Sequence, residues 1–409
     1  MRDSGNGAVS LDAAARSYVR IVLALADRDS DSLDSYHGPA EWQSEVRRRH
    51  ATLAQVRADA VALADSLRAR RAGDAGDEEQ RRAFLIRQLD AVASRIDILQ
   101  GARLPFDEEA RRLFALEAPA DARAPAGATA GHDEPAAIRA QLELLLPGRG
   151  DLAARYAAFD RQFLVPPDRL GAVLARAIDG CRAATRAHLP LPGRERVQVE
   201  SVRDLPWSAF TRYEGRLVSR VLVNASLPLT VDRALDLACH EAYPGHHTIA
   251  VLLESRFGDR RPELLVQPLF SPQSALHEAA ASLAPALAFP EPERIAFERD
   301  ALFPLAGLDP SAAARHAAVG RLVDRLHGVE AGVVRRYVDG ALDFPRAAAA
   351  LERDALMPSA DTTLKFVNQF RSYAATYTIG RDHLAHAVGT DWAAYLRAST
   401  DPAQLLPRF

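Results

Sequence analysis

The stretch His240-Glu241-Ala242-Tyr243-Pro244-Gly245-His246-His247 places three imidazoles and a carboxylate within eight residues. The run before it, residues 230–239, has the apolar spacing of an amphipathic helix, so the octet begins at a helix end. A His-Glu pair on a helix is typical of zinc hydrolases, in which His binds the metal and Glu acts on water. The second ligand normally stands four residues after the first, and Pro244 holds that position here. The octet therefore predicts a zinc site whose second ligand is displaced.

The Pro-Gly pair decides where that ligand can be. In a straight helix, position 247 lies about 20° from His240 around the axis but about 10 Å along it, and position 246 lies roughly 120° off the face. Proline lacks an amide hydrogen and glycine takes unusual dihedrals, so we expect a break, kink or bulge at Pro244-Gly245. Either His246 or His247 could then bind the metal. His246 needs the smaller insertion and is favoured, which would leave His247 to contact a ligand or the substrate.

A third ligand is expected downstream, because a catalytic zinc site has three protein ligands and an open position. The candidate is Glu278, in a helix of strong helix formers with small residues after it. A carboxylate within an apolar helix should be paired or bound to a metal. The alternative is an ordinary acid near a helix N-terminus that follows Ser274. The neighbouring His277 points about 100° away and is not expected to be a ligand.

The remaining chemistry requires a base and groups that stabilise negative charge on the substrate oxygen. Glu241 is the predicted general base, which takes a proton from the attacking water and returns it to the leaving group. Tyr373, Tyr377 and Arg381 are spaced i, i+4, i+8 and would share one side of a helix over 364–386. A phenol or guanidinium there could donate to an oxyanion or hold a substrate carboxylate. The alternative is a stripe of tyrosines that only packs.

The sequence pattern predicts a mainly α fold with one small sheet. Helical periodicity fills residues 1–190, which we expect to form an N-terminal helical lobe. The strand candidates 197–202 and 217–224 lie in a central part, 191–290, together with the metal-binding helices. Residues 291–409 are again helical and are expected to close a cleft as a C-terminal lobe.

The strand Leu217–Asn224 lies immediately before the predicted metal helix. An edge strand in this place could bind an extended peptide through its backbone, which makes Val221, Val223 and Asn224 the predicted substrate-binding residues. The alternative is a small sheet that only covers the core.

Composition limits the classes of partner and location. The 409 residues are 48% hydrophobic and 26% charged with a net charge of −3, so nothing favours binding to nucleic acid. No run approaches the roughly 20 apolar residues of a membrane span, so we expect no association with a membrane. The two cysteines, Cys181 and Cys239, are far apart in the sequence. We therefore expect no disulfide framework, a small buried role for Cys239, and a reducing cytoplasm as the location.

The octet also resembles the His-Glu-x-x-Pro-Gly-His-His signature of a large bacterial family of proteins described as a domain of unknown function. The similarity extends to most of the chain through the segments 34–39, 101–106, 224–228, 276–279 and 377–380. Two positions depart from the family pattern. Ala279 stands where the family commonly has glycine, and Ile249 stands where close relatives often carry an acid, which bears on substrate range more than on metal binding.

The resemblance implies a mainly helical zincin metallopeptidase fold, similar to thimet oligopeptidase and Taq carboxypeptidase. It also implies zinc ligands at His240, at one of His246 and His247, and at Glu278, with Glu241 as the base. Taken together, we expect a zinc-dependent hydrolase that cleaves short peptides. Two alternatives remain at this point: hydrolysis of a small-molecule amide or ester in a biosynthetic pathway, and a catalytically silent binding protein that keeps the cleft.

Overall fold

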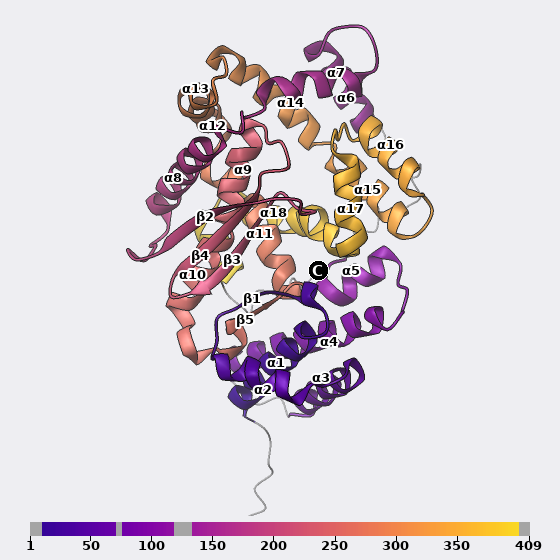
Figure 1. The fold of residues 1–409 in the computed structure, drawn as a ribbon, viewed down its shortest axis with the longest axis vertical. Helices are drawn as coiled ribbons and strands as arrows, with labels where there is room; N and C mark the ends of the chain where they lie inside the picture. Colours follow the sequence, from indigo (N-terminus) through magenta and orange to yellow (C-terminus); the bar gives the residue numbers. More distant parts are fainter. Residues whose placement is uncertain (1–9, 71–75, 118–132, 401–409) are drawn as a thin grey trace, which may run out of the picture.

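The computed structural model describes residues 10–70, 76–117 and 133–400 (Figure 1). The helices are α1 Leu11–Ala26, α2 Ala40–Arg49, α3 Leu53–Arg68, α4 Gly76–Leu99, α5 Phe106–Phe114, α6 Asp133–Leu145, α7 Leu152–Asp160, α8 Leu170–His188, α9 Val231–Glu241, α10 His246–Phe257, α11 Pro272–Ala288, α12 Glu291–Phe297, α13 Phe303–Ala306, α14 Ala313–Asp324, α15 His327–Val338, α16 Phe344–Asp354, α17 Ala360–Phe370, α18 Arg381–Val388 and α19 Trp392–Thr400. The strands are β1 Leu33–Tyr36, β2 Arg196–Val202, β3 Ala209–Gly215, β4 Val218–Asn224 and β5 Val266–Pro268. The chain is thus mainly helical with small sheets, as the sequence predicts.

Local polar groups set several helix ends. His50 takes a left-handed conformation with φ 48° and ends α2. Thr52 then caps α3 through a capping box with Gln55. Ser271 caps α11 by accepting a hydrogen bond from the backbone amide of Ser274. This cap fixes where α11 begins, about four and a half turns before its end and nearly two turns before Glu278.

The three-stranded sheet has the order β2-β4-β3, with β2 parallel and β3 antiparallel to β4. The predicted strands at 197–202 and 217–224 are confirmed as β2 and β4, while β3 was missed because Tyr213–Arg216 resembles a turn. β4 is the middle strand, so the premise that Leu217–Asn224 is an edge strand is wrong. On the side of the sheet away from β2, the edge strand is β3, which packs against α9 and α10.

The helices pack around several separate hydrophobic cores. Helices α1–α4 pack around Tyr18, Val22 and Leu89 at one end of the molecule, while α6 and α7 lie at the opposite end (Figure 1). Buried residues of α6–α8 belong instead to the core formed by the sheet, α9 and α14. The described residues of the predicted N-terminal lobe, 1–190, therefore belong to three cores, because α5 packs in a third one with Phe370 and Tyr373. β1 and β5 form a two-stranded antiparallel sheet between the lower helices and the larger sheet (Figure 1).

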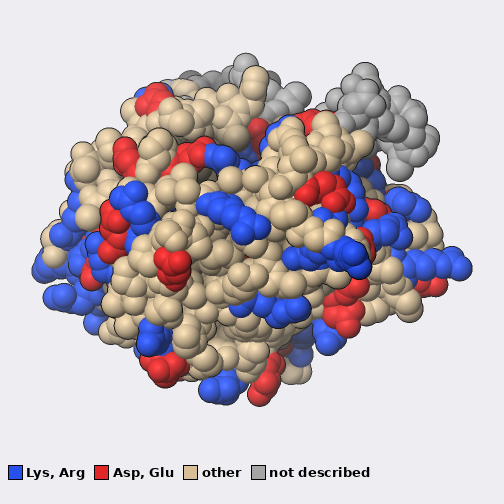
Figure 2. Space-filling model, turned by 90° about the horizontal axis from the view of Figure 1, so that it is seen from above, with Lys and Arg blue, Asp and Glu red and all other residues tan. Residues whose placement is uncertain are grey.

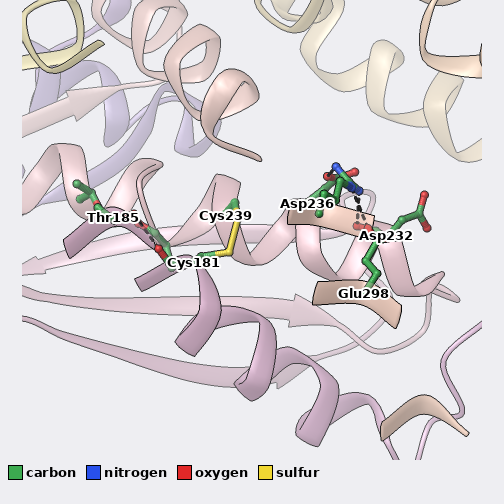
Figure 3. Close-up of a disulfide and its surroundings, with 9 residues drawn as sticks. Cys181, Thr185, Asp232, Asp236, Cys239 and Glu298 are labelled. Carbon is green, nitrogen blue, oxygen red and sulfur yellow. Dashed lines mark hydrogen bonds and ion pairs between the residues drawn. A yellow bond between two sulfur atoms is a disulfide. The ribbon is translucent and has the colours of Figure 1, made fainter. Parts of the chain in front are cut away.

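The two cysteines form a disulfide, which corrects the prediction that they are unpaired. Cys181 on α8 and Cys239 on α9 are fully buried, with their Cα atoms 5.5 Å apart (Figure 3). Their separation of 58 residues hides the pairing in the sequence, and the packing of α8 against α9 creates it. The cysteine content consequently gives no argument for a reducing compartment.

We expect this disulfide to stabilise the fold measurably. A disulfide that closes a loop of 58 residues lowers the entropy of the unfolded chain. In the loop-entropy model this raises the free energy of unfolding by about 4 kcal/mol. Guanidinium unfolding monitored by circular dichroism should therefore show a lower free energy of unfolding in the presence of a reductant. A Cys181→Ser/Cys239→Ser double variant should match the reduced protein and be insensitive to reductant. Two titratable thiols in the unreduced, denatured protein would contradict the pairing.

Charge on the surface is mixed. Figure 2 shows one face on which positive and negative side chains are interspersed over the described residues. Among the helices of residues 10–70, 76–117 and 133–400, none combines the length and apolar character that a bilayer crossing requires.

Candidate metal centre

The octet breaks into two helices, which confirms the break expected at Pro244-Gly245. α9 ends at Glu241 and α10 begins at His246, with a cis peptide bond between Tyr243 and Pro244. The amide of Gly245 donates to the carbonyl oxygen of Cys239 at 3.0 Å, so the loop folds back onto the end of α9. A Cβ atom at Gly245 would lie 1.7 Å from the carbonyl oxygen of His240. Only glycine fits this close approach.

The break brings three predicted ligands together. His246 Nε2 lies 3.2 Å from His240 Nε2 and 3.2 Å from Glu278 Oε1, and His240 Nε2 lies 3.4 Å from Glu278 Oε2. One potential ligand atom from each residue falls within 4.8 Å of the others. The side chains come from the last turn of α9, the first turn of α10 and the buried face of α11.

These spacings fit a tetrahedral zinc ion. Ligand atoms about 2.0–2.1 Å from a tetrahedral centre lie about 3.3–3.4 Å from one another, close to the separations seen here. Glu278 is buried, and its Oε2 has no hydrogen-bond partner among the described residues. A buried carboxylate oxygen facing two imidazole nitrogens needs a cation, and two nitrogens with one oxygen are a donor set that zinc accepts.

The electrostatics of the cluster also favour a cation. Burial opposes a charge on His246, but the Glu278 carboxylate outweighs it and raises the pKa of His246 to about 9. Burial likewise opposes a charge on Glu278, yet His246 and His240 hold the pKa of Glu278 well below its usual range. The negative potential that retains a proton on His246 would equally attract a metal ion in its place.

Two predicted tyrosines lie at this cluster. The Tyr373 hydroxyl donates to Glu278 Oε1 at 2.9 Å, with Ser274 Oγ 3.3 Å from the same hydroxyl. The Tyr377 ring lies over His240, with 6.3 Å between ring centroids. Burial, and then the charge of Glu278, raise the pKa of Tyr377 well above its usual value, so its hydroxyl keeps its proton. Tyr373 therefore orients a ligand, and the Tyr377 hydroxyl also interacts with the Glu278 carboxylate.

The helix expected over 364–386 is not continuous, which corrects the role predicted for Arg381. A 3₁₀ turn at Arg371–Ala375 and a π-helical turn at Thr376–Gly380 interrupt it. Such π turns occur often at functional sites. Because the pitch changes, the i, i+8 relation fails, and the Arg381 guanidinium binds the Asp324 carboxylate at 2.8 and 3.0 Å. Arg381 is engaged in an ion pair rather than offered to a substrate.

His247 is directed away from the metal cluster, which corrects its inclusion among the ligands. Its ring is fully buried, with Nδ1 2.7 Å from Ser219 Oγ and Nε2 3.1 Å from Glu195 Oε2. Ser219 therefore donates to Nδ1, and Nε2–H donates to the carboxylate. Both ring nitrogens are occupied, so the geometry favours His246 as the second ligand.

Glu195 anchors the loop that displaces His246. Besides His247, this buried carboxylate accepts hydrogen bonds from the Tyr243 hydroxyl at 2.5 Å and from Arg182 at 2.6 and 2.8 Å. Burial opposes its charge, but these donors outweigh that effect and lower the pKa of Glu195 to about 2. No local sequence pattern marks this residue, because it lies 52 residues before His247.

Glu241, the predicted base, is held by a residue that the sequence did not reveal. Thr211 on β3 places its hydroxyl 2.7 Å from Glu241 Oε2 and 2.9 Å from the Glu241 carbonyl oxygen. Glu241 is buried and follows His240 directly at the end of α9. The contact fixes the carboxylate against the sheet, at the helix end that carries His240.

The β4 residues that were predicted to bind substrate are buried in the protein interior instead. Val221 and Val223 are buried in the core between the sheet and α9. The fully buried Asn224 side chain donates to the carbonyl oxygens of Leu205 and Trp207 at 2.8 and 3.0 Å. None of the three can meet a substrate strand, since β4 is hydrogen-bonded on both sides.

A cavity of about 770 Å³ opens beside His246. One wall is a face of α10 that carries His246, Ala250 and Glu254, and the others include Tyr36 and the turn that joins β3 to β4. The residues meet only in the fold, so this cavity could not be located from the sequence.

Comparison with known proteins does not assign a family. No family model matches the chain, and no curated protein matches it. A solved structure of a proposed lipoprotein from Colwellia psychrerythraea is similar, with 14% identity and a TM-score of 0.49 over 86% of this chain and 67% of that one. A proposed lipoprotein of unknown function from Shewanella oneidensis has 12% identity and a TM-score of 0.46 over 89% of this chain and 74% of that one. The family resemblance of the octet therefore stays a prediction.

Proposed function

We propose that this protein is a zinc-dependent hydrolase of the zincin type that cleaves short peptides. The observation that carries the proposal is the convergence of His240, His246 and the partly unpaired Glu278 on one point, with Glu241 next to His240 in the chain. A catalytic zinc site has three protein ligands and one open coordination position, whereas a structural site has four protein ligands. Three ligands next to a carboxylate base therefore fit a catalytic site.

Each side chain of the site has a separate role in hydrolysis. Zinc held by His240, His246 and Glu278 would supply a Lewis acid that polarises the scissile carbonyl and lowers the pKa of water. Glu241 takes a proton from water as the water oxygen bonds to the carbonyl carbon. When the carbon–nitrogen bond breaks, Glu241 returns that proton to the leaving nitrogen. The Tyr377 hydroxyl donates to the carbonyl oxygen as negative charge develops there, while Tyr373 keeps Glu278 in place.

The surroundings of the metal cluster suit a short, extended substrate. The cavity of about 770 Å³ begins at His246 and follows α10 to Glu254, about 12 Å away at 1.5 Å per residue. That length accommodates roughly three to four extended residues. β3 lies at the sheet edge beside α9 and α10, where its backbone could pair with a peptide in place of the β4 edge expected from the sequence.

Metal removal tests the proposal. We expect purified protein to contain one zinc per chain and to hydrolyse members of a mixed tripeptide pool, monitored by liquid chromatography and mass spectrometry. Dialysis against 1,10-phenanthroline should abolish turnover, and added zinc should restore it. Protein that takes up no zinc, or turnover that survives removal of the metal, would rule the proposal out.

A further inference from the structure

The cavity beside His246 carries a carboxylate that the mechanism above does not use. This carboxylate belongs to Glu254 on α10, and His246, Ala250 and Glu254 all line the cavity. The three positions are spaced i, i+4, i+8, so they form one stripe along the helix. The rise of the helix places Glu254 about 12 Å from His246 along the axis. A substrate that binds at the metal and extends along α10 would therefore reach Glu254.

A tyrosine fixes the Glu254 side chain in this position. The hydroxyl of Tyr213 on β3 donates to Glu254 Oε2 and accepts a hydrogen bond from the backbone amide of Leu217 at 3.1 Å. Burial of Tyr213, together with its hydrogen bond to Glu254, raises the pKa of Tyr213 above its usual value, so the phenol keeps its proton and donates. Because Tyr213 contacts one carboxylate oxygen, Oε1 is available to a ligand.

No basic side chain balances the charge of Glu254. Within the part of the chain that the structure describes, no arginine, lysine or histidine lies within ion-pair distance of its carboxylate. Glu214, which lines the same cavity, differs because Arg220 donates to it at 2.9 Å. His37 lies edge-on to the Tyr213 ring, with 5.0 Å between ring centroids, but burial lowers the pKa of His37 and keeps it neutral at pH 7.

Two other charged residues of the cavity lining do not compensate Glu254. Asp259 follows α10 and adds a second exposed carboxylate. Arg216, at the turn between β3 and β4, is exposed and forms no ion pair with either acid. The carboxylate of Glu254 thus has one neutral hydrogen-bond donor and no cation.

Such a carboxylate gains most from a cationic ligand, because hydrogen bonds that involve charged groups are roughly twice as strong as neutral ones. We propose that Glu254 binds a positively charged group of the substrate, so that the proposed peptidase selects peptides with a cation about three to four residues from the scissile bond. This inference rests on the proposed function. The distance follows from the rise of an extended peptide, about 3.3 Å per residue, over the roughly 12 Å between His246 and Glu254. A lysine or arginine side chain and the α-ammonium of a short peptide supply the same cationic chemistry.

Binding without turnover provides the test. Zinc-loaded Glu241→Gln protein is dialysed to equilibrium against acetylated tetra-alanine amides in which lysine, or the uncharged norleucine of similar length, stands at each position in turn. A second pair compares tetra-alanine amide with a free and with an acetylated N-terminus. We expect a charged peptide of one series to bind at least about 10-fold more tightly than its uncharged partner, the effect of one charge-assisted hydrogen bond.

Variants assign that preference to the carboxylate. Adding Glu254→Gln should abolish it, because glutamine can keep the hydrogen bond from Tyr213 but carries no charge. The matched control Glu293→Gln, which neutralises an exposed glutamate on α12, should retain it.

Each result decides the inference. The lysine series and the free N-terminus identify which cation is bound, and a preference in either supports the inference. Equal binding of every charged peptide and its uncharged partner overturns it, and this comparison needs no Glu254 variant. A preference that survives Glu254→Gln in the folded protein overturns it as well. Failure of the proposed function appears instead as protein that takes up no zinc, which is measured in every sample and leaves the charge comparison readable.

Discussion

Glu241→Gln is expected to lower kcat by about 10²-fold to 10⁴-fold while zinc remains bound at one ion per chain. Glutamine keeps the shape of the side chain and can still contact Thr211, but it cannot take a proton from water. The ligands His240, His246 and Glu278 are unchanged, so metal affinity should stay near that of the wild type. Steady-state kinetics on a tripeptide from the hydrolysed pool, with zinc measured by mass spectrometry, checks both parts.

The matched control is Glu200→Gln, which neutralises an exposed glutamate on β2 that pairs with Arg220. Its kcat should equal that of the wild type, because a surface ion pair contributes little to the fold. A Glu241→Gln protein that retains full turnover with bound zinc would show that another group accepts the proton.

Gly245→Ala should weaken zinc binding by about 10²-fold or more. The added methyl would lie 1.7 Å from the carbonyl oxygen of His240 and 2.6 Å from that of Cys239, so the loop must move. That movement separates His246 from His240 and Glu278, and overpacking of this kind commonly costs about 1–3 kcal/mol of stability. Competition with a zinc chelator and thermal unfolding of the metal-free protein measure the two effects.

Gly320→Ala is the control for that substitution. Gly320 lies within α14, and a Cβ atom there meets nothing within 4 Å. Alanine should leave zinc affinity unchanged and stabilise the helix by up to about 1 kcal/mol. If Gly245→Ala bound zinc as tightly as Gly320→Ala does, the tight loop would not be what positions His246.

Features carried by neighbouring residues were predictable from the sequence. The break at Pro244-Gly245 follows from the backbone chemistry of those two residues, and the structure contains it. The helix that carries Glu278 follows from its run of helix formers. The mainly helical fold and the strands β2 and β4 follow from apolar periodicity in the same way.

Features that depend on distant partners were not predictable. The choice between His246 and His247 depends on Ser219 and Glu195, which occupy both ring nitrogens of His247. The disulfide depends on the packing of α8 against α9. These contacts join residues tens of positions apart, and no local pattern encodes which of them meet.

The strand order shows the same limit. β3 contains the Glu-Gly pair that precedes its turn, so its sequence resembles a loop, yet it pairs with β4 over most of its length. That pairing makes β4 a central strand and moves the sheet edge beside α9 to β3. Because β3 was missed, the prediction placed the substrate-binding edge on β4, although every residue of β4 was assigned correctly.

The most direct test of the metal centre is a crystal structure of zinc-loaded protein with anomalous diffraction measured at the zinc absorption edge. We predict one strong peak about 2.0–2.2 Å from His240 Nε2, His246 Nε2 and a Glu278 oxygen, with His247 still between Ser219 and Glu195. A peak bound by His247, a peak elsewhere in the molecule, or no peak after zinc loading would contradict the proposed site.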